Sequence, residues 1–448
     1  MERILIGSLK DHVGAEVMIQ CWVDVARNQG KVAFFDFRDR SGVVQGVIFG
    51  KPELQETARQ LKPEYVVSVT GIVKKRGEKQ INEKIQNGDI ELEITHIKII
   101  TAAETLPFDV DDDLNLDTLL DNRPITLRRG RERAIFLVQH EILSAYRTFL
   151  ANEGFIEFQA PKLVGSDAEG GGNVFKLDYF KDKYAYLATS PQLYKQILVG
   201  VFERVFSVGN VFRAEKHATT RHLNEYTSLD AEFGFITDHL DIMKLETALM
   251  RHIVDHLKTT CADAFTTLNV ALPMLPDGEL FPHMKLREAQ ALILEKTGKD
   301  KTSEPDLEPE DERWLCEYAH TELGSDFIFI THYPVLKRPF YTYEDENDIG
   351  FTKSFDLLFR GVEITTGGQR VHDAQRLIAN LEAKGLKPEN FTFYLQAFRH
   401  GMPPHGGWGM GLERLTQKFL NLESVKEATL FPRDINRIDT LLSKESHD

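Results

Sequence analysis

The stretch FRAEKHATTRHLNEY, residues 212–226, concentrates charge between two apolar runs. Seven of its fifteen residues can carry charge, whereas VFSVGNVF before it and TSLDAEFGF after it have the composition of β-strands. Antiparallel pairing of 204–213 with 222–235 predicts a hairpin whose connecting loop is 214–221. This hairpin is the centre of the predicted fold.

Two arginines flank the mouth of the predicted hairpin. Arg213 falls at a strand end and Arg221 on the far side of the loop. Converging guanidinium groups suit a polyphosphate, because each presents a planar fork of donors to anionic oxygens. The alternative is a solvated loop in which Glu215 and Glu225 are internal salt-bridge partners.

Composition limits the kind of protein that carries this hairpin. The 448 residues allow two to four domains, and a net charge of −15 argues against nucleic-acid binding over the whole surface, although a local basic face remains open. No run is apolar enough for a membrane span, and the first residues lack the apolar core of a signal peptide. The cysteines, Cys21, Cys261 and Cys316, show no CxxC spacing. We therefore expect a cytoplasmic protein without disulfides.

The N-terminal part, residues 1–102, reads as a small β-barrel. Its β-rich runs are 16–25, 31–40, 43–50, 64–75 and 90–100, with a helix candidate at 52–61. Five strands with one helix after the third favour an OB-fold, a common oligonucleotide platform, over an SH3-like barrel. Within the second run, aromatic and basic side chains interleave at Phe34, Phe35, Phe37, Arg38 and Arg40. One face of that strand could stack unpaired bases, while a core strand is the alternative.

An acidic segment, 103–130, reads as a hinge or linker, and residues 131–448 form the second domain. Hairpins and amphipathic helices alternate there without a βαβ rhythm. We expect an α+β fold, with an antiparallel sheet flanked by helices. The segment TSEPDLEPEDER, 302–313, is expected to be a solvated connection.

Glycine and arginine meet again in GMGLERLTQKFL, 409–420. The glycines allow close approach to a ligand, and Arg414 lies near the positive end of a predicted helix. Neither a Walker loop nor a dinucleotide fingerprint is present. A glycine-assisted helix start is the alternative reading.

A third constellation is SFDLLFRGVEITTGGQR, 354–370. Asp356 and Glu363 could meet across adjacent strands as oxygen ligands of Mg²⁺, with Arg370 beside the Gly-Gly pair. Acidic residues at a sheet edge are the alternative.

The fourth constellation joins EGGGNVF, 169–175, to SPQLYKQ, 190–196. A glycine triplet beside an acid can form a mobile lid, whereas Lys195 alone would be a surface lysine. Together the four constellations supply the parts of one ATP-dependent site.

Taken together, these stretches resemble the class II aminoacyl-tRNA synthetases with an N-terminal OB-fold anticodon-binding domain. The resemblance spans nearly the whole chain, with motif 1 at about 134–161, motif 2 at about 204–235 and motif 3 at about 405–421. SPQLYKQ, SFDLLFRGVEITTGGQR and FRHGMPPHGGWGMGLER look like the aspartyl enzymes of the archaeal and eukaryotic type.

The resemblance implies a role for individual residues. Arg213, Glu363 and Arg414 are implied to be catalytic. The implied ATP contacts are Arg213, Ala214, Glu215, Arg221, His222, Leu223, Tyr226, Glu363, Gly411, Leu412, Glu413 and Arg414. The implied aspartate contacts are Glu169, Gln192, Leu193, Tyr194, Lys195, Arg213, Asp230, Thr366 and Arg370. Mg²⁺ is implied at Glu363, Thr366 and Asp356, and anticodon contacts at Phe34 and Gln45.

The implied activity is aspartate–tRNA ligation with ATP as substrate, Mg²⁺ as cofactor and tRNA-Asp as partner. Motif 1 implies a homodimer. Whether tRNA-Asn is also charged stays open, because the segment RGEKQINEKIQNGD, 76–89, departs from the family pattern. The alternatives are an asparaginyl-tRNA synthetase, a related asparagine synthetase and a non-catalytic RNA-binding paralogue.

Overall fold

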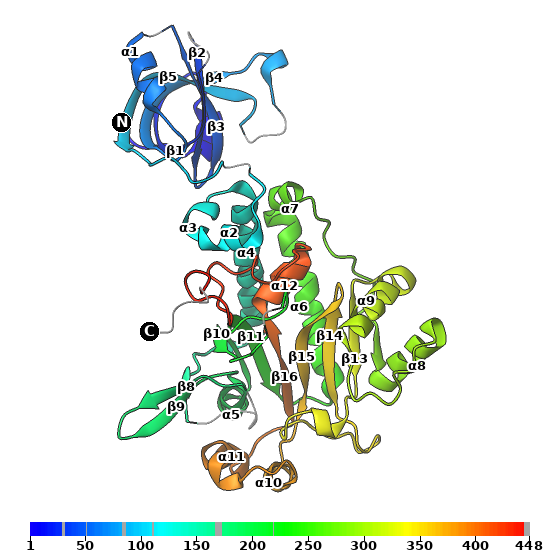
Figure 1. The fold of residues 1–448 in the computed structure, drawn as a ribbon. Coiled ribbons are helices and arrows are strands. Elements are labelled where there is room, and N and C mark those ends of the chain that lie inside the picture. Colours follow the sequence, from blue (N-terminus) through cyan, green and yellow to red (C-terminus); the bar gives the residue numbers. More distant parts are fainter. Residues whose placement is uncertain are drawn as a thin grey trace. The chain divides into compact units, whose positions relative to one another are not determined.

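The computed structural model describes residues 1–28, 32–50, 52–82, 87–109, 112–165, 173–217 and 219–442. The chain divides into two compact units, Met1–Asp113 and Leu114–Asp448. Each has its own hydrophobic core, and Figure 1 shows the elements of both. In the described residues no helix is long and apolar enough to cross a membrane.

The first unit is a closed five-stranded barrel. Its strands are β1 (Glu16–Asn28), β2 (Val32–Asp39), β3 (Gly42–Phe49), β4 (Val66–Lys75) and β5 (Ile90–Thr101), in the order β1-β2-β3-β5-β4. Helix α1 (Pro52–Gln60) follows the third strand, and 3-10 helices span η1 (Ile6–His12) and η2 (Glu78–Gln80). This is the predicted OB-fold arrangement, and the barrel prediction is confirmed.

Alternation along β2 separates the core from the outer face of the barrel. Phe35 and Phe37 are buried in the core, whereas Phe34 is only half-buried. On the neighbouring strand Gln45 is also half-buried and pairs with Asp36. Because side chains two apart on a strand share a face, Phe34 and Asp36 lie on the outside.

The second unit is built on an eight-stranded sheet. Its order is β12 (His283–Lys285), β13 (Phe327–Thr331), β14 (Ser354–Phe359), β15 (Val362–Arg370), β16 (His405–Gly411), β11 (Glu225–Gly234), β10 (Arg204–Phe212) and β6 (Ile156–Glu157). All neighbours from β13 to β10 are antiparallel, and only the end strands β12 and β6 pair in parallel. A separate sheet has the order β7 (Leu163–Val164), β9 (Lys183–Leu187), β8 (Lys176–Tyr179). The predicted antiparallel sheet is confirmed, with parallel edges added.

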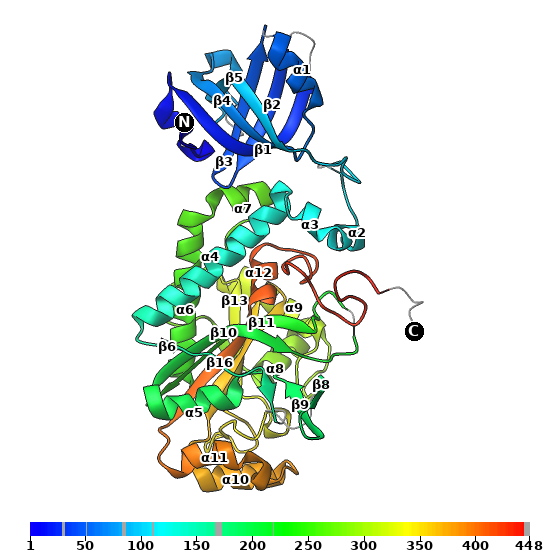
Figure 2. The same cartoon turned by 90° about the vertical axis from the view of Figure 1, so that its left-hand side faces the viewer.

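Helices cover both faces of the large sheet. They are α2 (Leu116–Asp121), α3 (Arg123–Thr126), α4 (Gly130–Asn152), α5 (Gln192–Phe202), α6 (His239–Thr260), α7 (Ala262–Leu268), α8 (Leu286–Thr297), α9 (Pro309–Leu323), α10 (Ala374–Ala383), α11 (Thr392–Arg399) and α12 (Leu412–Phe419), with 3-10 helices η3 (Val335–Lys337) and η4 (Pro388–Phe391). In Figures 1 and 2, α4 and α6 run beside each other, and α10 and α11 lie together at the end of the unit away from α7. Side chains of α4, α6 and α12 share one core with the sheet, and those of α5, α10 and α11 share another.

Part of the expected linker, 103–130, has regular structure. Helices α2 and α3 lie within it, and the division between the units falls after Asp113. The buried Arg123 donates hydrogen bonds to the backbone carbonyls of Glu427, Thr429 and Leu430. These bonds attach the segment to the C-terminal part of the second unit.

Candidate functional site

A cavity of about 480 Å³ opens on the face of the large sheet opposite α4 and α6. Strand alternation explains its position. Leu229 and Ala231 of β11 point into the core shared with those helices, whereas Tyr226, Ser228 and Asp230 line the cavity.

Glycines keep the floor of the cavity open. In β16 the sequence Gly-Trp-Gly-Met-Gly places Trp408 and Met410 in the core, while Gly409 and Gly411 line the cavity. At Gly407 an added Cβ would collide with the carbonyl of Ala231 and the carboxylate of Glu232. Only glycine therefore fits at this position.

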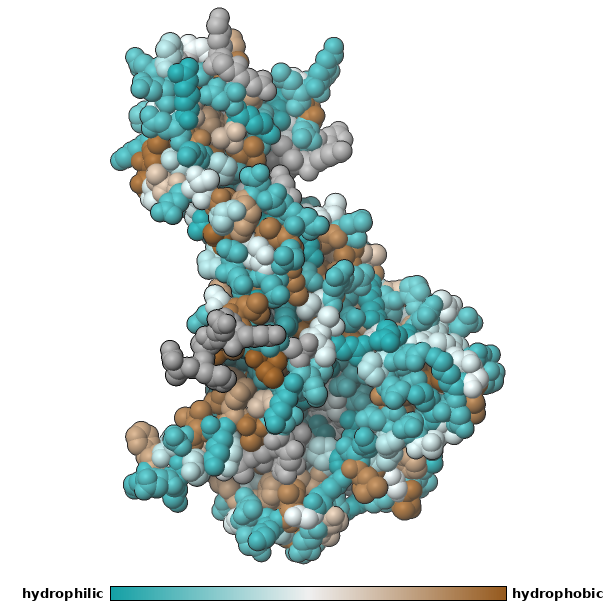
Figure 3. All heavy atoms as spheres, in the orientation of Figure 1, coloured by the Kyte–Doolittle hydropathy of each residue, from teal (hydrophilic) through white to brown (hydrophobic). Residues whose placement is uncertain are grey.

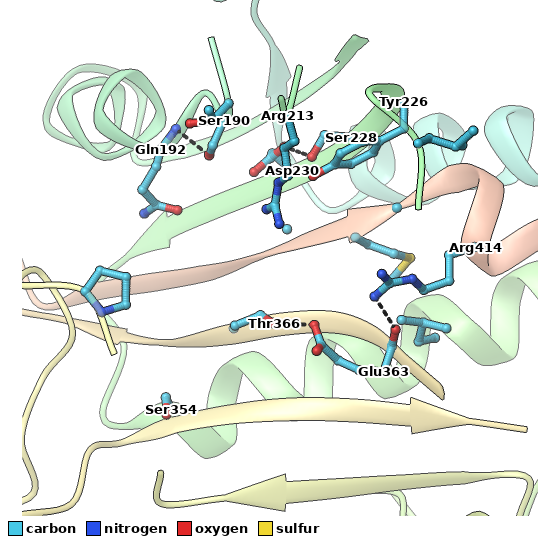
Figure 4. A pocket seen from close by; sticks show the side chains of 18 of the residues that line it. Ser190, Gln192, Arg213, Tyr226, Ser228, Asp230, Ser354, Glu363, Thr366 and Arg414 are labelled. Carbon is cyan, nitrogen blue, oxygen red and sulfur yellow. Dashed lines mark hydrogen bonds between the residues drawn. The ribbon is translucent and has the colours of Figure 1, made fainter. Parts of the chain in front are cut away.

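The cavity brings together most of the predicted site residues. It is lined by Gln192, Arg213, Glu215, Arg221, His222, Leu223, Tyr226, Asp230, Glu363, Thr366, Arg370, Gly411, Glu413 and Arg414. Figure 4 shows Ser190 and Gln192 towards one end, Glu363 and Arg414 towards the other, and Arg213 between them. Residues from four separate stretches of the sequence thus share one cavity.

Other predicted residues lie elsewhere. Leu193 and Tyr194 line a second cavity of about 490 Å³ that also involves α11. Ala214 does not line the first cavity, and its backbone N–H donates to the carbonyl of Asn173 at 2.7 Å. Leu412 is buried in the core at the start of α12. Glu169, the expected lid residue, lies outside the described residues.

The predicted hairpin carries the middle of the site. Strands β10 and β11 pair antiparallel from Arg204 with Phe233 to Phe212 with Glu225, as predicted. The guanidinium carbon of Arg213 lies 5.7 Å from the ring centroid of Tyr226. This geometry leaves a planar aromatic surface and a cation at the same wall of the cavity.

A cluster of charged side chains closes one end of the cavity. Arg414 Nη1 donates to the backbone carbonyl of Glu363 at 2.8 Å (Figure 4). Arg221 Nη1 donates to Glu312 Oε2 at 2.9 Å, and its Nη2 to the carbonyl of Gly361 at 3.1 Å. Burial, and then the charge of Glu363, raise the pKa of Glu312. The two arginines make this end suited to a polyanion.

A β-bulge in β15 brings two oxygen ligands to the same face. The register shifts between Glu363 and Thr365, so that Glu363 and Thr366, three residues apart, both reach the cavity. Thr366 Oγ1 donates to Glu363 Oε1 at 2.7 Å. The sequence pattern contained no sign of this bulge.

Asp356 approaches the same place from β14. It pairs with Thr366 across the strands, and its Oδ2 accepts from Arg338 Nη2 at 2.7 Å. Burial raises the pKa of Asp356 to about 6, with Glu363 adding to the rise and Arg338 opposing it. Asp356 does not line the cavity.

The donor set fits Mg²⁺ held largely by phosphate oxygens. The described residues contain no group of three or more His, Cys, Asp or Glu side chains that could hold a metal. Magnesium commonly uses one or two carboxylates together with substrate phosphates, so Glu363, the Thr366 hydroxyl and nearby Asp356 are compatible with it.

Buried ions lie below the opposite end of the cavity. The fully buried Lys195 Nζ donates to Asp230 Oδ1 at 3.0 Å and to the carbonyl of Trp408 at 2.8 Å, and lies 3.3 Å from Glu232 Oε2. Arg370 Nε donates to Glu232 Oε1 at 2.9 Å. Burial opposes the charge of Glu232, but Arg370 and Lys195 hold the pKa of its carboxyl below the usual value. Lys195 is therefore an interior residue, and the alternative that it is a surface lysine is excluded.

Three contributors were missed at the level of sequence. Glu232 follows Asp230 by two residues, so strand alternation could have placed it on the same face. Glu312 lies in the segment expected to be solvated, yet its side chain is only 14% exposed. That expectation is wrong for Glu312, because the segment ends in the first turn of α9. No motif or charge pattern in the sequence around Arg338 pointed to a role in the site.

The comparisons with known proteins agree with this geometry. The family model described as tRNA synthetases class II (D, K and N) matches residues 115–435, and the model for an OB-fold nucleic acid binding domain matches 17–100. An aspartate–tRNA(Asp/Asn) ligase of Thermus thermophilus is 44% identical over 97% of this chain and 99% of its own length. An aspartate–tRNA(Asp) ligase of Thermoplasma volcanium is 40% identical over 98% of this chain and all of its own length. The crystal structure of asparaginyl-tRNA synthetase from Pyrococcus horikoshii with asparaginyl-adenylate has a TM-score of 0.88, at 32% identity over 98% of this chain and 99% of that one.

Proposed function

The chain belongs to the class II tRNA synthetases of the D, K and N group, and we propose that it joins L-aspartate to tRNA with ATP as the energy source. One observation carries the proposal. A single cavity has Arg414 at one end, Arg213 in its middle and the buried cation Arg370 away from Arg414. An ATP molecule and an acidic amino acid would meet between them.

The first step needs no nucleophile from the protein. An α-carboxylate oxygen of aspartate attacks the α-phosphorus of ATP in line, and the bond to pyrophosphate breaks. Arg213 stands in the middle of the cavity, where it would neutralise the developing charge and align the reacting groups. Tyr226 would stack on adenine, with Glu215 beside it. The hydroxyl of the terminal tRNA adenosine then attacks the acyl carbon, and AMP leaves.

Glu363 and Thr366, with Asp356 nearby, would hold Mg²⁺, which neutralises phosphate charge when it is bound. Arg221 and Arg414 would hold the β- and γ-phosphates from the other side. His222, Leu223, Gly411 and Glu413 complete this wall.

Aspartate is favoured over asparagine by the buried ions below the cavity. Lys195 and Arg370 are held by Asp230 and Glu232, and Arg370 also lines the cavity together with Gln192, so its guanidinium is available to a ligand. A side-chain carboxylate would make a charge-assisted contact with Arg370 that asparagine cannot make, and a site built for such a group rejects an analogue that lacks it.

Exchange of labelled pyrophosphate into ATP with each amino acid tests the choice. We expect exchange with aspartate and little with asparagine. Exchange with asparagine alone would identify an asparaginyl enzyme. Binding of tRNA without any exchange would identify a non-catalytic RNA-binding paralogue.

The barrel would bind the anticodon through its outer face, where Phe34 and Gln45 are both half-buried. A half-buried aromatic ring on the outer face still offers a stacking surface to an unpaired base. Charging of tRNA-Asp and tRNA-Asn transcripts side by side decides whether one or both are substrates.

We also propose a homodimer in the cytoplasm. Exposed apolar side chains gather near the β6 edge of the large sheet, at Ile156, Phe202 and Phe235. Burial of this patch against a second copy would remove it from water. The three cysteines are free and buried, which suits a reducing compartment. Sedimentation equilibrium of wild type and Phe235→Glu, with Ile349→Glu as an exposed control outside the patch, tests the dimer.

A further inference from the structure

Arg221 is held on two sides before any ligand is present. It lines the cavity, yet its side chain is only 25% exposed. Glu312 Oε2 accepts from Nη1 at 2.9 Å, and the Gly361 carbonyl accepts from Nη2 at 3.1 Å. Two of the five guanidinium N–H groups are thereby engaged, which leaves others for an anion in the cavity.

Glu312 comes from outside the stretches that form the cavity wall. It lies in the first turn of α9, which Pro309 begins and a capping box between Glu308 and Asp311 fixes. Its side chain turns inward and is 14% exposed, whereas Glu310, two residues earlier, is 59% exposed and pairs with Lys299. Hydrophilic side chains predominate over the outer surface of α8 and α9 in Figure 3, so an inward carboxylate is an exception there.

The surroundings of Glu312 are mostly cationic. Besides Arg221, its charge interacts with Arg414 and Lys418, and with the carboxylate of Glu363. Glu312 itself does not line the cavity. It can therefore act on a ligand only through the side chains that do.

Stabilisation of the fold alone does not explain the contact between Arg221 and Glu312. The pair is mostly buried, and such a pair is weak evidence for stability because the cost of desolvation offsets the Coulomb attraction. A stabilising role also does not require the guanidinium to face a cavity. Fixing a long arginine side chain in advance lowers the entropy lost when it binds a phosphate. The contact is therefore expected to contribute more to ligand binding than to the stability of the fold.

We propose that Glu312 is a positioning residue that presets Arg221 for the β- and γ-phosphates of ATP. The inference rests on the proposed function, because that function puts a polyphosphate at this end of the cavity. Glu312 would thereby couple α9 to the ATP site.

The test is direct binding of Mg-ATP to the full-length protein by calorimetry, with Glu312→Gln and matched controls. Glutamine can still accept a hydrogen bond from Arg221 but lacks the charge that strengthens it, so we expect the Kd for ATP to rise up to about tenfold. Glu310→Gln, on the exposed side of the same helix, should leave the Kd unchanged. The KM for aspartate should stay at its wild-type value. The Tm of Glu312→Gln should fall by no more than about 4 °C, because the amide oxygen keeps an acceptor for Arg221, and a loss of folding would exceed that.

A double-mutant cycle with Arg221→Met separates positioning from an independent effect. In that background Glu312→Gln should change the Kd by less than about twofold. An unchanged Kd in the single variant, or an equal loss in both backgrounds, would overturn the inference. ATP binding is measured without aspartate, so the two proposals can fail separately. If Glu312→Gln weakens ATP binding as expected but the wild-type protein shows no pyrophosphate exchange with aspartate, only the proposed function is refuted.

Discussion

Arg414 is the residue whose removal most simply tests the phosphate end of the site. It lies in the first turn of α12, and its guanidinium is fixed to the backbone of Glu363. Arg414→Ala is expected to lower pyrophosphate exchange by about a hundredfold or more, since a preorganised cation on the β- and γ-phosphates, which leave as pyrophosphate, is lost. Binding of tRNA, measured by filter retention, should be nearly unchanged. Arg399→Ala, an exposed arginine on α11, serves as the control. Normal exchange in Arg414→Ala would remove this residue from the ATP site.

Lys195 tests the amino-acid end, and here stability and activity change together. Lys195→Leu leaves the buried carboxylates of Asp230 and Glu232 without one of their cations. We expect the free energy of unfolding in urea to fall by about 3–5 kcal/mol. The KM for aspartate should rise far more than the KM for ATP. Lys337→Met, an exposed lysine on the cavity rim, should preserve stability. Equal losses for both substrates would contradict the assignment of Lys195 to the amino-acid end.

Single residues show where sequence reasoning succeeds and where it stops. Arg213, Glu363 and Arg414 were predicted to share a site, and they line one cavity. Their chemistry is visible in the sequence because each lies in a distinctive run of glycine or charge. Glu312 was missed because an acidic helix start has the same composition whether its side chain is solvated or paired across the fold.

Helix α6 carries a buried acid whose titration is expected to control stability. Burial under the sheet raises the pKa of Glu246 from 4.5 to about 8. Between these values folded Glu246 keeps its proton while the unfolded chain loses it, so stability falls as pH rises and levels off above the higher value. Glu246→Gln should remove this contribution. The Tm of the variant, measured relative to that of wild type, should therefore increase from pH 5 to pH 8 (roughly the titration range). Glu382→Gln, at an exposed position on α10, should keep the wild-type slope, and an unchanged slope in Glu246→Gln would refute the assignment.

Elements were easier to predict than their details. The pairing of β10 with β11 followed from two apolar runs around a polar loop, and it is confirmed. The bulge in β15 could not be predicted, because an extra residue in a strand leaves the local composition unchanged. That bulge, rather than simple alternation, places Thr366 beside Glu363.

At the scale of the whole molecule, the two units have separate cores and are expected to work separately. The barrel core lies within residues 6–97, and the remaining core clusters begin at Ile135. A protein that starts at Leu114 should fold and retain pyrophosphate exchange. Its kcat/KM for charging tRNA should fall at least about tenfold, since base stacking on the barrel is lost. Loss of exchange in a folded second unit would show that the barrel is needed for adenylate formation.

The central claim is that the chain places aspartate, rather than asparagine, on tRNA. The most direct measurement offers the full-length protein ATP, a tRNA-Asp transcript and an equimolar mixture of the two amino acids, and identifies the esterified product by mass. The account predicts aspartate on the 3′ end, with asparagine absent or a small minority. Asparagine as the main product would contradict it.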